Sequence, residues 1–135
     1  MKYGKIIERH FKGVKMNCLN NIILEGNIKN ISVNYDTEKG ENIIKSDIEV
    51  SRFYKDNQTG DIKKEVSVFS FVYSSVWDRE KIERLFSIGR GVRIVGYLKQ
   101  SSFDIMGVKS EKVFIVAQHV EFKPDFRSKK NQETK

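Results

Sequence analysis

The sequence predicts an all-β protein with one helix, folded as a small five-stranded barrel. Five stretches alternate apolar and polar residues or carry runs of β-branched and aromatic residues, which is typical of strands. A helical period occurs once, between the third and fourth of these stretches. The chain has 135 residues, 39% of them hydrophobic and 32% charged, which suits one globular domain with a single core.

The composition also restricts the class of function. A formal net charge of +7 favours a polyanionic partner, because lysine and arginine displace counterions condensed on phosphate backbones. The single cysteine, Cys18, excludes an internal disulfide and suits a reducing cytoplasm. No apolar run approaches the ~20 residues of a membrane span, and residues 1–10 lack the apolar segment of a secretion signal. A membrane protein is therefore not expected.

The first two strands are expected in the N-terminal half. Leu19–Ile28 is predicted as a strand whose interior glycine marks a bulge or a tight bend, as at a barrel corner. The alternation continues over 30–36, so one curved strand is expected. A turn at 37–42 leads to a second strand over 43–54, and the polar loop at 56–61 predicts a hairpin.

The third strand is centred on the stretch from Val66 to Tyr73 and permits two interpretations. Alternation places Val66, Val68, Ser70 and Val72 on one face and Ser67, Phe69, Phe71 and Tyr73 on the other. In the first interpretation the valines fill the core, and the aromatic face is left for flat ligands such as nucleobases. In the second, Phe69 and Phe71 form the core, and the valines face another sheet or a partner subunit. These residues alone leave both interpretations open.

The second half completes the barrel. Ser74 or Ser75 is expected to cap a helix that runs from Val76 to Phe86. A fourth strand over 92–98, a projecting loop or hairpin over 99–109 and a fifth strand over 112–122 follow. Five strands with a helix between the third and fourth give the order of the OB-fold, a Greek-key barrel that commonly binds oligonucleotides. Residues 1–16 are expected to be a basic N-terminal extension, and 123–135 a basic polar tail.

Three segments resemble the bacterial single-stranded DNA-binding protein (SSB) family in their order and rough spacing. They are Asn20–Ile28 in the first strand, Tyr54–Asp61 at the second hairpin and Gly89–Leu98 in the fourth strand. Phe103 resembles the aromatic residue that follows this last segment in the family. The resemblance covers residues 17–122, and it implies an OB-fold domain over this range that binds single-stranded DNA.

The resemblance also implies where a DNA strand would lie. Tyr54, Tyr73 and Phe103 match aromatics that stack bases in the family, and Lys99 lies where the family often has a basic residue. Because Phe69 and Phe71 share the predicted face of Tyr73, the resemblance favours the first interpretation of the third strand. Ser67 departs from the pattern, since the family has an aromatic there. The full predicted nucleic-acid-binding set is Arg52, Phe53, Tyr54, Lys55, Phe69, Phe71, Tyr73, Lys99 and Phe103.

We therefore expect sequence-tolerant binding and protection of single-stranded DNA in replication, recombination or repair, by base stacking and by Lys/Arg contacts to phosphates. The alternative is a primosome-type or protein-interaction OB-fold paralogue that acts within a replication complex. The family forms homotetramers or dimers, so a homo-oligomer in the cytoplasm, associated with the nucleoid, is expected. The family's acidic C-terminal tip, which recruits other enzymes, is not seen in this sequence, which suggests a divergent member.

An enzyme is not expected. His10 and His119 are isolated in the sequence, and neither a metal-ligand spacing nor a glycine-rich phosphate loop occurs. The sequence therefore predicts no catalytic residues, no metal, no cofactor and no small-molecule substrate.

Overall fold

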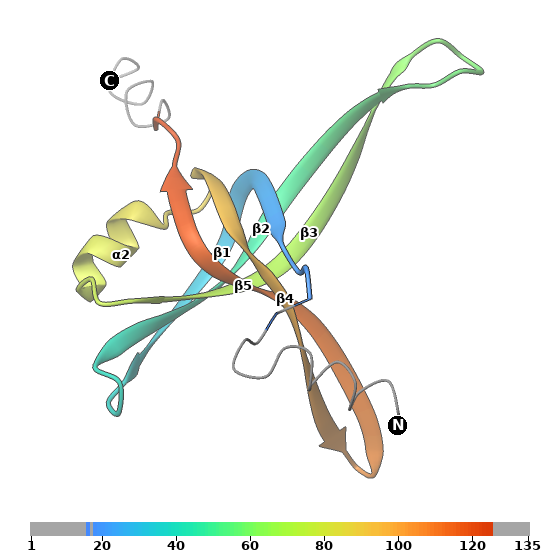
Figure 1. Cartoon of the computed structure of the whole chain (residues 1–135). Coiled ribbons are helices and arrows are strands. Elements are labelled where there is room, and N and C mark those ends of the chain that lie inside the picture. The colour runs from blue at the N-terminus through green and yellow to red at the C-terminus, as the bar shows by residue number, and fades with distance from the viewer. Residues whose placement is uncertain (1–15, 17, 126–135) are drawn as a thin grey trace.

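The computed structural model describes residues 16 and 18–125, which form a closed five-stranded barrel with one helix (Figure 1). In chain order the elements are β1 (Ile22–Asp36), β2 (Glu41–Lys55), β3 (Ile62–Ser75), α2 (Arg79–Leu85), β4 (Gly91–Ile105) and β5 (Val108–Phe122). Around the barrel the strands follow the order β1-β2-β3-β5-β4, and β1 pairs with β4 to close it. Neighbouring strands are antiparallel, except that β3 and β5 are parallel. The predicted five-stranded barrel, with its helix between the third and fourth strands, is confirmed.

The core is filled from the inward positions of the strands and from α2. On β2, Ile44 and Ile48 are fully buried, so the side chain of the intervening Lys45 points outward and is exposed. Ile82 in the middle of the helix and Phe86 at its C-cap are also fully buried in the same cluster. The helix therefore stabilises the barrel through this apolar side, and the outward positions of the strands are left for other roles.

β1 is one continuous curved strand, as predicted. Its register with β2 shifts between Ile28 and Asn30, which marks a bulge. At Gly26 a side chain would collide with the carbonyl group of Glu49 on β2, so glycine lets the two strands approach closely. Gly96 has the same role where β4 faces the backbone of β5. The bulge and the close approaches account for the tight curvature of the barrel.

Two hairpins extend from the barrel in different directions (Figure 1). The β2–β3 ladder continues out to Lys55 and Ile62, and the β4–β5 ladder to Ile105 and Val108. Residues 99–109, predicted as a projecting loop or hairpin, are thus the outer part of a regular β-hairpin. The two hairpins lengthen the surface that the barrel offers to a ligand.

The helix begins later than predicted. Its N-cap is Asp78, not Ser74 or Ser75, because the Asp78 carboxylate accepts a hydrogen bond from the backbone N–H of Lys81 at 2.8 Å. The Ser75 hydroxyl oxygen instead accepts a hydrogen bond from the backbone N–H of Trp77 at 3.0 Å. Serine and aspartate are both good caps, and the extension of β3 to Ser75 decides between them.

The predicted N-terminal extension lies outside the described residues except for Met16, and the predicted tail is described only as far as Asp125. The division of the chain at residues 16 and 123 therefore stays a prediction. Within the part of the chain that the structure describes, no helix is long and apolar enough to span a membrane.

Candidate nucleic-acid interface

The inward face of β3 is its aromatic face, contrary to the interpretation that the resemblance favoured. β3 residues Phe71 and Tyr73 pair with Ser46 and Ile44 of β2, both of which are buried inside the barrel. The Phe71 side chain is only 1% exposed and belongs to the core. A base cannot stack on a ring that the core surrounds, so the prediction of Phe71 as a DNA-binding residue is wrong.

Tyr73 is also packed against the core rather than presented to a ligand. Its ring lies 6.3 Å from the Trp77 ring and 6.2 Å from the Phe86 ring, measured between centroids. These contacts place Tyr73 between the barrel and the start of the helix. The alternation in β3 was predicted correctly, but the two faces were assigned the wrong way round, because the space beneath the helix needs large side chains.

The valine face of β3 points outward. Val66 and Val68 are exposed and Val72 is half-buried. Opposite Val72 in the ladder lies Lys45, and opposite Ser70 lies Asp47, both on β2. The outward side chains of β3 therefore share a surface with charged residues of β2.

The hairpin of β2 and β3 divides the predicted site residues between its two faces. Tyr54, 37% exposed, lies on the face of Phe69, which is 42% exposed; the Arg52 guanidinium lies 5.1 Å from the Tyr54 ring centroid. Phe53, 66% exposed, lies on the opposite face, where the Lys64 ammonium is 6.0 Å from its ring centroid. Strand alternation makes this division unavoidable for consecutive residues.

The β4–β5 hairpin brings the remaining predicted residues together with residues that the sequence reasoning missed. Lys99 of β4 pairs with Phe114 of β5. Phe103, which is 43% exposed, lies four residues after Lys99 and therefore on the same face of β4. Lys112 lies on this face too, since it pairs with Ser101. The predicted set lacks Lys45, Lys112 and Phe114. The alternation of Phe114 with Ile115 on β5 and of Lys45 with Ile44 on β2 is visible in the sequence and could have indicated that these side chains point outward.

A cavity of about 380 Å³ lies among outward positions of β1 to β5. We define the outer face as the lining of this cavity that points away from the core, together with the neighbouring outward residues of the two hairpins. Its members are Asn30, Ser32, Lys45, Asp47, Ser70, Val72, Ser101, Lys112 and Phe114, extended by Lys99 and Phe103 on β4 and by Phe53 and Lys64 on the β2–β3 hairpin.

A carboxylate is held rigidly in this cavity. Asp47 accepts hydrogen bonds from the Asn30 amide at 2.8 Å and from the Ser70 hydroxyl at 2.7 Å. Its own backbone N–H donates to the Asn30 side-chain oxygen at 3.1 Å. The hydrogen bonds from Asn30 and Ser70 lower the pKa of Asp47 below its ordinary value, and the charge of Lys112 adds to the effect.

The lysines of the outer face have no carboxylate partner in the part of the chain that the structure describes. Within the described residues, Lys45, Lys64, Lys99 and Lys112 form no ion pair with a carboxylate. Arg52, by contrast, is paired with Glu65 at 3.0 Å. An unpaired ammonium group is available to a phosphate, whereas Arg52 would have to exchange its carboxylate first.

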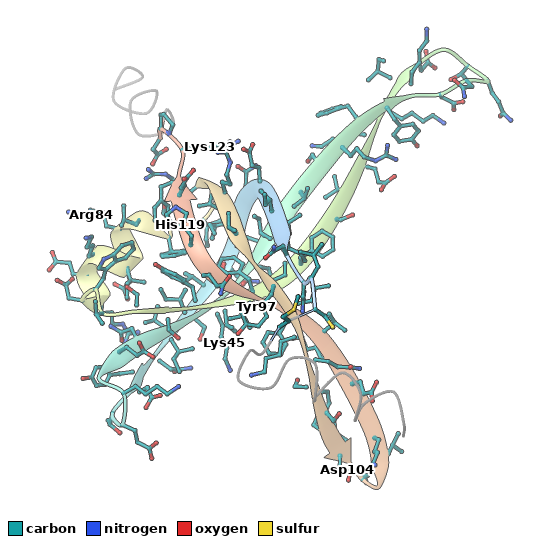
Figure 2. All side chains as sticks on the ribbon, viewed as in Figure 1. Lys45, Arg84, Tyr97, Asp104, His119 and Lys123 are labelled. Carbon is teal, nitrogen blue, oxygen red and sulfur yellow. The ribbon has the colours of Figure 1, made fainter. Side chains whose placement is uncertain are left out.

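Among the described residues, no cluster of three or more His, Cys, Asp or Glu side chains could hold a metal ion. His119 lies on β5 beside Glu121, at 3.2 Å (Figure 2). It is therefore an exposed side chain with a hydrogen-bonding neighbour on the surface of the barrel.

The arrangement defines a class of protein: an OB-fold barrel whose outer face carries unpaired lysines beside accessible aromatic rings. Residues 19–123 match the family described as the single-strand binding protein family, and the chain belongs to this family. The suspected resemblance is thereby confirmed, as is the prediction of a binding protein rather than an enzyme. No curated protein sequence matches the chain.

Solved structures agree with this assignment at the level of the fold. A Plasmodium falciparum SSB in complex with ssDNA has a TM-score of 0.67 and 16% identity, covering 82% of this chain and 100% of that one. A small single-stranded DNA-binding protein from Streptomyces coelicolor has a TM-score of 0.61 and 15% identity, covering 80% and 96%. A deletion mutant of the single-stranded DNA binding protein from Thermus aquaticus has a TM-score of 0.64 and 17% identity, covering 78% of this chain but 51% of that one.

Proposed function

We propose that the protein binds single-stranded DNA along its outer face, with little dependence on sequence over most of the contact. The observation that carries this proposal is the combination of unpaired lysines and exposed aromatic rings on the outward faces of the barrel and of its two hairpins. Phosphates would contact Lys45, Lys99 and Lys112, while bases stack on neighbouring rings. Membership of the single-strand binding protein family supports the same ligand.

Only some of the aromatic residues predicted from the sequence remain as candidates for base stacking. On the outer face we assign Phe53 and Phe103, both of which are exposed, and add Phe114 beside Lys99. Tyr54 and Phe69 would contact a strand that passes over the other face of the β2–β3 hairpin. Lys55, at the end of β2 and without an ion pair among the described residues, lies on the same face as Phe53 by strand alternation and would add a phosphate contact on the outer face.

The biological role follows from the ligand. A protein of this kind would cover and protect unpaired DNA during replication, recombination or repair, in the cytoplasm and on the nucleoid. We further propose a homo-oligomer, a dimer or a tetramer, as the family resemblance implies.

A salt titration tests the proposal. The affinity of the whole chain for a fluorescein-labelled oligo-dT is measured by anisotropy between 50 and 300 mM NaCl, with the matching duplex as competitor. Phosphate contacts from Lys45, Lys64, Lys99 and Lys112 predict a slope of log K against log salt of about −3 for a single strand, and a contact from Lys55 would steepen it to about −3.5. A labelled oligomer is the better reporter, because Trp77 packs against Tyr73 rather than on the outer face.

Matched charge variants locate the contact. Lys45→Gln should make the slope shallower by about 0.7, whereas Arg84→Gln should leave it unchanged. Arg84 is equally cationic but lies on α2, on the side of the barrel away from both hairpins (Figure 2). An equal effect of the two substitutions, or no binding to oligo-dT, would contradict the proposal and favour a protein-interaction role for this face.

A further inference from the structure

The cavity of the outer face contains a negative charge, which is unexpected on a surface that contacts phosphates. Asp47 lines it together with Lys45 and Lys112. A phosphate placed in the cavity would be attracted by the lysines but repelled by the carboxylate. The part of a DNA strand that suits a fixed carboxylate is instead a base edge that donates hydrogen bonds.

The carboxylate is positioned and still able to accept further hydrogen bonds. One oxygen accepts from the Asn30 amide at 2.8 Å and the other from the Ser70 hydroxyl at 2.7 Å. Each carboxylate oxygen has about two lone-pair sites, so each retains one. Asp47 is ionised at neutral pH, and these two hydrogen bonds lower its pKa further below the ordinary value of 3.8. Asp47 is thus a preorganised acceptor rather than a mobile surface charge.

The rest of the lining suits the flat part of a base. Val72 and Phe114 give the cavity an apolar wall, and its volume of about 380 Å³ lies within the range of small-ligand sites. Lys45 and Lys112 stand where the phosphates on either side of a bound nucleotide could be neutralised.

We propose that this cavity holds one nucleobase of the bound strand, and that the Asp47 carboxylate accepts a hydrogen bond from the exocyclic amino group of that base. The inference rests on the proposed binding of single-stranded DNA and adds a base preference to it. Cytosine presents an amino group at its C4 position, whereas uracil presents a carbonyl oxygen there, which the carboxylate repels. The two pyrimidines have the same ring size, so stacking and fit do not separate them.

The test compares labelled oligo-dC and oligo-dU of equal length, using the full chain and anisotropy at one fixed salt concentration near pH 7. We expect wild-type protein to bind oligo-dC at least ~5-fold more tightly, the lower bound for a direct contact to a base edge. Asp47→Asn should bring the ratio close to one. Equal affinity of wild-type protein for the two oligomers overturns the inference but leaves the proposed function standing, whereas binding to neither refutes the proposed function.

Two further variants keep the result specific. Glu49→Gln removes the same charge from the same face of β2, but Glu49 lies outside the cavity and is paired with Lys29 at 3.0 Å. The Glu49→Gln variant should retain the wild-type ratio of the affinities for oligo-dC and oligo-dU. If this variant loses the preference, net charge sets the preference and the inferred base contact does not. Ser70→Ala leaves Asp47 unchanged but removes one of the two hydrogen bonds that position its carboxylate. The ratio of the affinities for oligo-dC and oligo-dU should therefore fall in this variant. An unchanged ratio in this variant also overturns the inference.

Discussion

Replacing Phe103 with alanine separates a stacking role from a structural one. Phe103 is 43% exposed on the β4–β5 hairpin, beyond the part of β4 that contributes to the core. Its removal should therefore change the free energy of unfolding little. Stacking on one aromatic ring contributes about 1–3 kcal/mol per base. A loss of this size corresponds to a rise in Kd of about 5- to 150-fold.

The assay is the anisotropy of a labelled oligo-dT at fixed salt, with thermal unfolding measured on the same samples. Val113→Ala is the matched control, because Val113 is an exposed apolar residue on the same hairpin but on the face opposite Phe114. It should leave the Kd within about twofold of wild type. An unchanged Kd for Phe103→Ala would remove this ring from the site, and an equal loss for both variants would show that the hairpin itself was disturbed.

Three predictions concern the fold. Phe71→Ala should lower the free energy of unfolding by about 3–5 kcal/mol in urea denaturation, because it empties a core position; a surface role would leave stability intact. Asp78→Ala should cost about 1 kcal/mol, since the N-cap hydrogen bond to Lys81 is lost, while Ser74→Ala should cost far less. Hydrogen bonds from neighbouring side chains lower the pKa of Asp47 from its ordinary 3.8. The ionised carboxylate therefore stabilises the fold above about pH 4. This contribution is lost as the pH falls through the lowered pKa. The difference in unfolding free energy between wild type and Asp47→Asn should therefore narrow below pH 4, and a constant difference would contradict this.

The fold could be predicted because its determinants are local. In β2, Ile44 and Ile48 are four residues apart and therefore lie on the same face of the strand. The two-residue period of a strand is enough to predict this. The bend of β1 was indicated by Gly26, whose missing side chain permits the approach of β2. The helix start at Asp78 could not be placed as well, because its position depends on how far β3 continues in the barrel.

The site could be predicted less completely, because a strand pattern shows two faces without showing which is inside. In β3 both faces are apolar, one through valines and one through aromatics. The choice is made by the neighbours: Phe71 lies inside because its partner strand places Ser46, a small residue, beside it. The resemblance to a family whose aromatics bind DNA pointed to the opposite face. Phe53 and Phe103, in contrast, lie on the outer parts of hairpins, where the exposure of a side chain does not depend on which face of the barrel is inside.

Ion pairing decides where the positive charge of the chain can act. At the C-terminal end of β5, Arg93 and Lys123 share Glu25, with the Lys123 ammonium 2.7 Å from its carboxylate. These partners lower the pKa of Glu25, first through the hydrogen bond from Lys123 and then through that from Arg93, so the carboxylate stays ionised and continues to offset their charge. Figure 2 shows Lys123 at this end of β5 and Asp104 at the far end of the β4–β5 hairpin. Lys45 and Lys112 have no ion pair among the described residues and line the cavity, so their charge is available to a ligand on the outer face.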